Sequence, residues 1–291
     1  MSDDIKVKDG YVYGGWREPK NLWTNLTDSI HDDDVAKSVG MRGGTIPGTI
    51  HLSLFGPIVF KVFGDQWFEK GTLSLYYTYA TTDREKVRAI IALPPEEAED
   101  VQVEAKIELI GGQTVAQGTI SMGNPTELSY LKVIALKNSP PEDLRILAHL
   151  KPGLEMPSKE FLLTQKDAIK GLDWICDPLE YYKIQSPWGS PILSPTAMYG
   201  AMALGADWLD SHTIDAVPFY GATEIQLVNG PVRVGVPYKV TGTIVCIGVS
   251  SKTEYFWYDS VLEDKESGKQ IAKMRHLNRF MKASSPLYKE E

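Results

Sequence analysis

The stretch PGTIHLSLFGPIVFKVFG, residues 47–64, decides the fold. When it is wound as a helix, apolar side chains fall on nearly every face, and the stretch is too long for one strand. The pattern therefore predicts a helix that is buried all round, and other elements must cover it.

Four shorter segments follow this helix and have the composition of strands. They are rich in β-branched and aromatic residues, and Pro, Gly or acidic turns separate them. They are GTLSLYYTYATT (71–82), EKVRAIIAL (85–93), DVQVEAKIEL (100–109) and QTVAQGTISM (113–122). We expect consecutive antiparallel strands.

The second half of the chain repeats this order. A helix is expected in SPTAMYGAMALGADWLDS (194–211). Four strands are expected after it, in ATEIQLVNG (222–230), YKVTGTIVCIGV (238–249), TEYFWYDSVLED (253–264) and KQIAKMRHLNRFM (269–281). One apolar helix followed by a meander of strands thus occurs twice, which indicates a duplication.

The segment NSPPEDLRILAHLKPGLEMPSKE (138–160) lies between the halves and lacks strand alternation. We interpret it as the connection and predict two domains, 1–150 and 151–291. A curved antiparallel sheet wrapped around one long central helix is the hot-dog arrangement, in which the helix covers one sheet face. The sequence therefore predicts an α+β fold, a tandem (double) hot-dog.

Composition excludes several functions. The net charge of −8 argues against general affinity for nucleic acid or anionic membranes. The N-terminal MSDDIKVKDGYVYGG has no apolar signal region, and no apolar run reaches the length of a membrane span. We expect a cytoplasmic chain. There is no Gly-x-Ser-x-Gly elbow, Walker loop or dinucleotide fingerprint, and no cofactor is expected.

Residues 26–31, Leu-Thr-Asp-Ser-Ile-His, precede the first helix and lead through GMRGGTIPG (40–48) into it. This order resembles the MaoC-like (R)-specific enoyl-CoA hydratases and dehydratases. Their signature, Asp-x-Asn-Pro-x-His, lies on an overhang before the hot-dog helix, and a Gly-rich turn follows it.

The match to the signature is partial. His31 occupies the histidine position, but Leu26 stands at the aspartate position and Asp28 at the asparagine position. A parallel trace in the second half, Ile175-Cys176-Asp177-Pro178-Leu179-Glu180, has Ile175 at the aspartate position and Glu180 at the histidine position. Neither half keeps the complete Asp–His pair.

The resemblance implies a lyase that acts on an acyl-CoA or acyl-carrier thioester. His31 is then the base or acid, Asp28 a relocated carboxylate partner, and Gly48, Thr49 and His51 the oxyanion and substrate contacts at the start of the helix. Asp177 and Glu180 mark a pseudo-symmetric second site. A hot-dog thioesterase that uses one of these two carboxylates and a non-catalytic acyl-binding subunit remain alternatives. A homodimer is expected, although a double hot-dog already contains the equivalent of a two-subunit dimer.

Structural explanations compete for the same residues. Asp32, Asp33 and Asp34 suit a helix N-terminus, and ligands adjacent on one short helix converge poorly on a metal, so no metal site is expected. His51 fits a hydrogen-bonded core histidine, and Asp177 with Glu180 fits a structural polar cluster. Two aromatic runs, 76–79 and 255–258, fit strand faces that pack on the helices, with some rings free to line an acyl tunnel.

Overall fold

The computed structural model describes residues 4–26, 29–204 and 215–289. Its described strands form one sheet in the order β1-β2-β4-β5-β6-β3-β8-β11-β10-β9-β7, and all pairs are antiparallel. The first-half strands are β1 (Lys6–Lys8), β2 (Tyr11–Tyr13), β3 (Thr72–Tyr77), β4 (Val87–Ala92), β5 (Val101–Leu109) and β6 (Thr114–Met122). The second-half strands are β7 (Glu155–Leu162), β8 (Pro218–Leu227), β9 (Pro237–Val249), β10 (Thr253–Asp264) and β11 (Gln270–Met281).

The helical elements are short. The α-helices are α1 (Asp33–Ser38), α2 (Gly56–Phe63), α3 (Trp67–Lys70), α4 (Gln165–Gly171) and α5 (Pro195–Met202). The 3-10 helices are η1 (Gly48–Phe55), η2 (Gly64–Gln66), η3 (Pro141–Asp143), η4 (Leu172–Trp174), η5 (Glu180–Tyr182), η6 (Lys282–Ser284) and η7 (Pro286–Tyr288). Among the described residues, none of these helices has the length and apolar character needed to cross a membrane.

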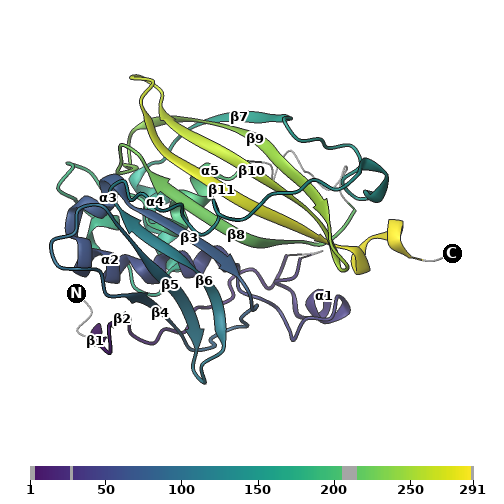
Figure 1. The fold of residues 1–291 in the computed structure, drawn as a ribbon, viewed down its shortest axis with the longest axis horizontal. Helices are drawn as coiled ribbons and strands as arrows, with labels where there is room; N and C mark the ends of the chain where they lie inside the picture. The colour runs from purple at the N-terminus through teal and green to yellow at the C-terminus, as the bar shows by residue number, and fades with distance from the viewer. Residues whose placement is uncertain (1–3, 27–28, 205–214, 290–291) are drawn as a thin grey trace.

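The two halves meet edge to edge where β3 pairs with β8, with Leu73 opposite Ile225. Figure 1 shows the strands of both halves side by side, with α5 behind those of the second half. All eight strands expected from the sequence are confirmed, and TEYFWYDSVLED matches β10 residue for residue.

The central helix of the first half differs in detail from the expectation. Residues 48–63 are helical and largely buried, but the first eight form the 3-10 helix η1 and the α-helix begins at Gly56. Pro57 lies in the first turn of α2, where its missing N–H costs no hydrogen bond. In the second half the predicted 194–211 helix is wrong beyond Met202, because α5 ends there and Ala203 is extended. Residues 205–211 lie outside the described residues.

The prediction that the connection lacks a strand is wrong for its last residues. Residues 155–162 form β7, an edge strand paired with β9. The register shifts between Met156 and Lys159, around Pro157. Proline cannot donate a hydrogen bond to a neighbouring strand, but it is tolerated at sheet edges and bulges. Because Pro157 interrupts the alternation of this edge strand, the sequence pattern did not indicate it.

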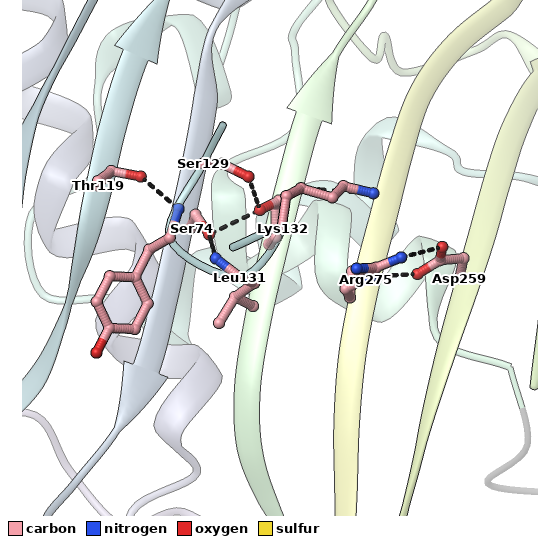
Figure 2. A network of polar contacts seen from close by, with 9 residues as sticks. Ser74, Thr119, Ser129, Leu131, Lys132, Asp259 and Arg275 are labelled. Carbon is pink, nitrogen blue, oxygen red and sulfur yellow. Dashed lines mark hydrogen bonds and ion pairs between the residues drawn. The ribbon is translucent and has the colours of Figure 1, made fainter. Parts of the chain in front are cut away.

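The segment between β6 and the connection, around residues 129–131, crosses the sheet face opposite the central helices. Leu131 is fully buried there with Ala222, Trp257 and Leu277. Ser74 Oγ and Ser129 Oγ donate to Glu224 Oε2 over 2.7 and 2.5 Å, and Leu131 N donates to Ser74 Oγ (Figure 2). This network fixes residues 129–131 over the seam between β3 and β8.

A second buried carboxylate, Glu254, holds the connection itself. Glu254 accepts hydrogen bonds from the backbone N–H groups of Arg145, Ile146 and Leu147 and from Tyr288 Oη. The donors to Glu254 are thus backbone and side-chain groups that hold the chain in place. The same is true of the two serines that donate to Glu224 Oε2. Both buried glutamates therefore stabilise the fold.

Candidate functional site

A cavity of about 570 Å³ lies beside the start of η1. The first half contributes the overhang that contains His31, the N-terminal residues of η1, and the end of β3. The second half contributes Trp174, the first turns of α5, and the start of β8. The cavity is therefore built by both halves, and His31, Gly48, Thr49 and His51 all line it.

His31 is held in one orientation by the backbone of the Gly-rich segment. Its Nδ1 atom lies 2.6 Å from the carbonyl oxygen of Thr45, and Thr45 N donates to the carbonyl of Ile30 over 2.8 Å. Because a carbonyl only accepts, His31 Nδ1 carries the proton and donates, and in the neutral ring Nε2 keeps its lone pair. Burial lowers the pKa of His31 below its ordinary value of 6.5, although the bond to Thr45 opposes the shift. At neutral pH the His31 ring is therefore uncharged, and its Nε2 atom can act as a base.

His51, in the first turn of η1, is both a core histidine and a cavity residue. It is 1% exposed, and its Nε2 atom lies 2.8 Å from Thr81 Oγ1. Its Nδ1 atom is buried and has no partner among the described residues. Burial lowers the pKa of His51 to about 4, so the ring is neutral at pH 7 and offers one free nitrogen.

Gly48 and Thr49 begin η1, and the first N–H groups of a helix have no partner within it. A Cβ added at Gly48 would lie 3.0 Å from Cγ and Cδ2 of Tyr77, so glycine allows the helix start to pack on this ring. Thr196 Oγ1 of α5 donates to the carbonyl of Thr49 over 2.9 Å, and Ser53 Oγ donates to Thr196 Oγ1 over 2.7 Å. The second half thus anchors the start of the helix.

Among the described lining residues there is no carboxylate. Leu26, at the aspartate position of the signature, lines the cavity and is 49% exposed. Asp28, the relocated partner expected from the sequence, lies outside the described residues. The titratable lining groups in the described part of the chain are histidines and tyrosines.

The second-half trace does not join this cavity. Asp177 Oδ2 accepts from Arg17 Nη2 over 2.5 Å, and Glu180 is an exposed residue whose Oε1 accepts from Lys183 Nζ over 2.7 Å. Each carboxylate therefore has a basic partner at the protein surface, and neither lies among the residues that line the cavity with His31.

Of the three aspartates after His31, Asp32 caps α1, and Asp33 and Asp34 lie in its first turn, as the structural explanation predicted. Asp32 accepts from the N–H groups of Asp34 and Val35, and Asp33 Oδ1 accepts from Gly44 N over 2.7 Å. Asp33 thus also ties α1 to the Gly-rich turn that leads to Gly48. No group of three His, Cys, Asp or Glu side chains in the described residues is arranged to hold a metal ion.

Sequence reasoning missed the second-half lining residues. Trp174, Tyr199, Phe219 and Tyr220 all face this cavity. Trp174 comes directly before the trace Ile175 to Glu180, and Tyr199 lies in the apolar helix, so both were close to segments already singled out. What the sequence did not provide was the pairing of β3 with β8, which brings them to His31.

Comparison of the sequence finds no matching family model and no matching curated protein. Comparison of the structure finds many similar chains. A protein described as a MaoC domain dehydratase from Chloroflexus aurantiacus J-10-fl is 10% identical, with a TM-score of 0.59 over 96% of both chains. The tesB protein of Mycobacterium avium subsp. paratuberculosis is 9% identical, with a TM-score of 0.51 over 95% of both chains.

The peroxisomal multifunctional enzyme type 2 of Drosophila melanogaster is 11% identical, with a TM-score of 0.50 over 92% of this chain and 48% of that chain. At such low identity these likenesses concern the fold. The chain has the hot-dog fold, and the predicted fold class is confirmed.

Proposed function

We propose that this protein is a hot-dog lyase that adds water to, or removes it from, an acyl thioester. The observation that carries the proposal is the state of His31. Its Nδ1 proton is donated to Thr45, and its Nε2 lone pair has no protein partner among the described residues that line the cavity with it. A neutral imidazole fixed in this tautomer is a suitable general base at pH 7.

The reaction needs one proton to be taken and returned. In hydration, His31 Nε2 takes a proton from water while the oxygen bonds to the β-carbon of an enoyl thioester. The electrons of the double bond move toward the thioester carbonyl, and an enolate forms. The protonated imidazole then gives its proton to the α-carbon, which regenerates neutral His31. Dehydration runs the same steps in reverse.

The enolate oxygen needs hydrogen-bond donors. The N–H groups of Gly48 and Thr49, at the start of η1, suit this role because first-turn amides are free to bind an external acceptor and the helix dipole favours negative charge there. His51 lines the same cavity, so its ring is a second contact for water or substrate.

Asp28 remains the proposed carboxylate partner of His31, three positions before it in the sequence. The proposed carrier is coenzyme A or an acyl-carrier protein, and a cytoplasmic homodimer is part of the same proposal. A thioesterase that uses Asp177 or Glu180 has less support, because both carboxylates pair with basic side chains away from the cavity.

A second candidate function has one observation in its favour. Leu26 lines the cavity at the signature's aspartate position, and leucine can neither activate water nor take a proton. An acyl-binding subunit that performs no chemistry would need only the apolar and aromatic walls.

An assay with two readouts separates the candidates. The purified protein is incubated with a series of enoyl-CoA and saturated acyl-CoA thioesters, and both alkene absorbance and free thiol are recorded. A lyase removes alkene absorbance without releasing thiol, and a thioesterase releases thiol. Binding of the thioesters without either change supports the acyl-binding subunit.

A further inference from the structure

The walls of the cavity are unusually rich in aromatic rings. Seven of the 26 lining residues are Phe, Trp or Tyr, whereas these types make up 10% of the chain. The seven are Trp23, Tyr77, Tyr79, Trp174, Tyr199, Phe219 and Tyr220. They come from separate elements of both halves, so the enrichment does not arise from one aromatic run in the sequence.

The inner rings are held firmly in place. Tyr77 Oη donates to Thr223 Oγ1 over 3.0 Å, and Thr223 Oγ1 lies 2.9 Å from Nδ1 of the fully buried His276. Because Thr223 Oγ1 accepts from Tyr77, its own hydroxyl proton is available to be donated to His276 Nδ1. With its hydroxyl engaged in this way, Tyr77 contributes its ring, and not a polar tip, to the wall beside Gly48.

Two further rings pack around the same histidine. The ring centroids of Tyr199 and Tyr220 each lie 4.9 Å from that of His276 and 5.3 Å from each other. Their planes are tilted by 59°. This part of the wall therefore consists of flat surfaces at an angle, backed by a buried imidazole that limits their movement.

Two tryptophans extend the aromatic lining to the mouth of the cavity, next to His31. Trp23 of the overhang and Trp174 of η4 lie with ring centroids 5.8 Å apart, and Trp23 lies 6.0 Å from His31. Trp174 is 40% exposed although it is one of the largest apolar side chains. One tryptophan from each half thus flanks the approach to His31.

We infer that the acyl group handled by this cavity carries an aromatic ring and is not a linear alkyl chain. The inference rests on the proposed function and specifies its substrate class. Tilted and edge-to-face ring pairs contribute more binding free energy than the area that they bury accounts for. A ligand ring therefore gains this extra free energy from the aromatic walls, and an alkyl chain does not. The volume of about 570 Å³ also suffices, since a cavity of about 150 Å³ holds a benzene molecule.

The test compares two enoyl thioesters of equal carbon number, trans-5-phenyl-2-pentenoyl-CoA and trans-2-undecenoyl-CoA. Two methylene groups separate the phenyl ring from the double bond, so the reacting atoms are alike in both. We expect kcat/KM for hydration to be at least about tenfold higher for the phenyl substrate, the factor that one or two aromatic contacts supply. Equal or better turnover of the undecenoyl substrate would overturn the inference and leave the proposed function intact.

If neither thioester is hydrated, that outcome counts against the proposed function. The preference for an aromatic acyl group is then tested by binding. The saturated 5-phenylpentanoyl-CoA and undecanoyl-CoA are then compared by calorimetry. A dissociation constant about tenfold lower for the phenyl compound supports the inference, and equal or weaker binding overturns it.

A matched pair of variants locates the selectivity. Phe219 lines the cavity, whereas Phe161 is a partly buried phenylalanine on β7 that contacts Tyr238. Phe219→Leu is expected to reduce the preference for the phenyl compound to less than about threefold, since one aromatic contact is lost. Phe161→Leu should retain the full preference, and equal loss in both variants would contradict the assignment.

Discussion

His31 Nδ1 lies 2.6 Å from the carbonyl oxygen of Thr45, and this contact fixes which nitrogen of the ring is free to act as a base. The contact joins the overhang to the Gly-rich turn that leads into η1. The same turn therefore sets the tautomer of His31 and positions the first amides of the helix.

The state of His31 predicts the acid side of the pH profile. Because burial lowers its pKa below 6.5, the active neutral form persists at pH values where an ordinary histidine is already protonated. We expect kcat/KM to be constant around neutral pH and to fall only below pH 6.5. A profile measured between pH 4.5 and 8.5 checks this, and an acid limb centred above pH 6.5 would show that another group controls the reaction.

Leu26→Asp is expected to create or raise hydration of an enoyl-CoA. The change restores the carboxylate of the signature at a position that lines the cavity, and a positioned acid–base group contributes about 10²- to 10⁴-fold in rate. Leu26 is 49% exposed, so we expect the free energy of unfolding to change by only about 0.5 kcal/mol.

Leu22→Asp is the matched control for this gain, because Leu22 is 47% exposed and is not among the lining residues. The same gain in both variants would point to a general effect of charge. A folded Leu26→Asp protein without any gain, alongside an active wild type that Asp28→Asn cripples, would indicate that Asp28 already does this work.

Gly48→Ala tests the start of η1. The added methyl group would lie 3.0 Å from the Tyr77 ring, so either the helix start or the ring must shift by a few tenths of an ångström. Small displacements of catalytic groups are costly, and we expect kcat/KM to fall by about tenfold. Gly171→Ala, which has no atom within 4 Å of the added Cβ, should keep full activity. Unchanged kinetics in folded Gly48→Ala would exclude these amides from the site.

Two buried histidines predict acid sensitivity of the fold. Burial lowers the pKa of His51 to about 4 and that of His276 to about 3, from 6.5. Below pH 6.5 the unfolded chain binds protons that the folded chain does not, so stability is full above this pH and is lost as the pH falls. We expect the free energy of unfolding to decrease by about 2 kcal/mol between pH 6 and 5.

Urea titrations at several pH values measure this dependence. His276→Gln should remove about half of it, whereas His149→Gln, which replaces an exposed histidine, should leave it unchanged. A flat dependence between pH 6 and 5 in the wild type would mean that the two rings are protonated in the folded protein.

Much of the fold could be predicted because local pattern and burial agree. The β10 segment alternates Phe256 and Tyr258, on the face of the central helices, with Trp257 and Asp259 on the opposite face, and its predicted bounds are confirmed. β7 was missed because Pro157 interrupts its alternation at an edge, where a strand loses little by such an interruption.

The candidate site was predictable only on its first-half side. His31, Gly48, Thr49 and His51 lie close together in the sequence, and all line the cavity. The opposite wall depends on the long-range pairing of β3 with β8, which no local pattern encodes. The trace at Asp177 and Glu180 matched in register, but its surroundings differ, because Arg17 and Lys183 pair with the two carboxylates.

The most direct test of the central claim is the hydration rate of an enoyl-CoA with wild type and with His31→Ala, with free thiol measured in the same cuvette. His149→Ala serves as the control for loss of a histidine. We expect the wild type and the control to remove alkene absorbance without releasing thiol, and His31→Ala to be slower by about 10²- to 10⁴-fold while remaining folded. Thiol release that accompanies the reaction, or a His31→Ala rate equal to that of the wild type, would contradict the assignment of His31 as the base of a hot-dog lyase.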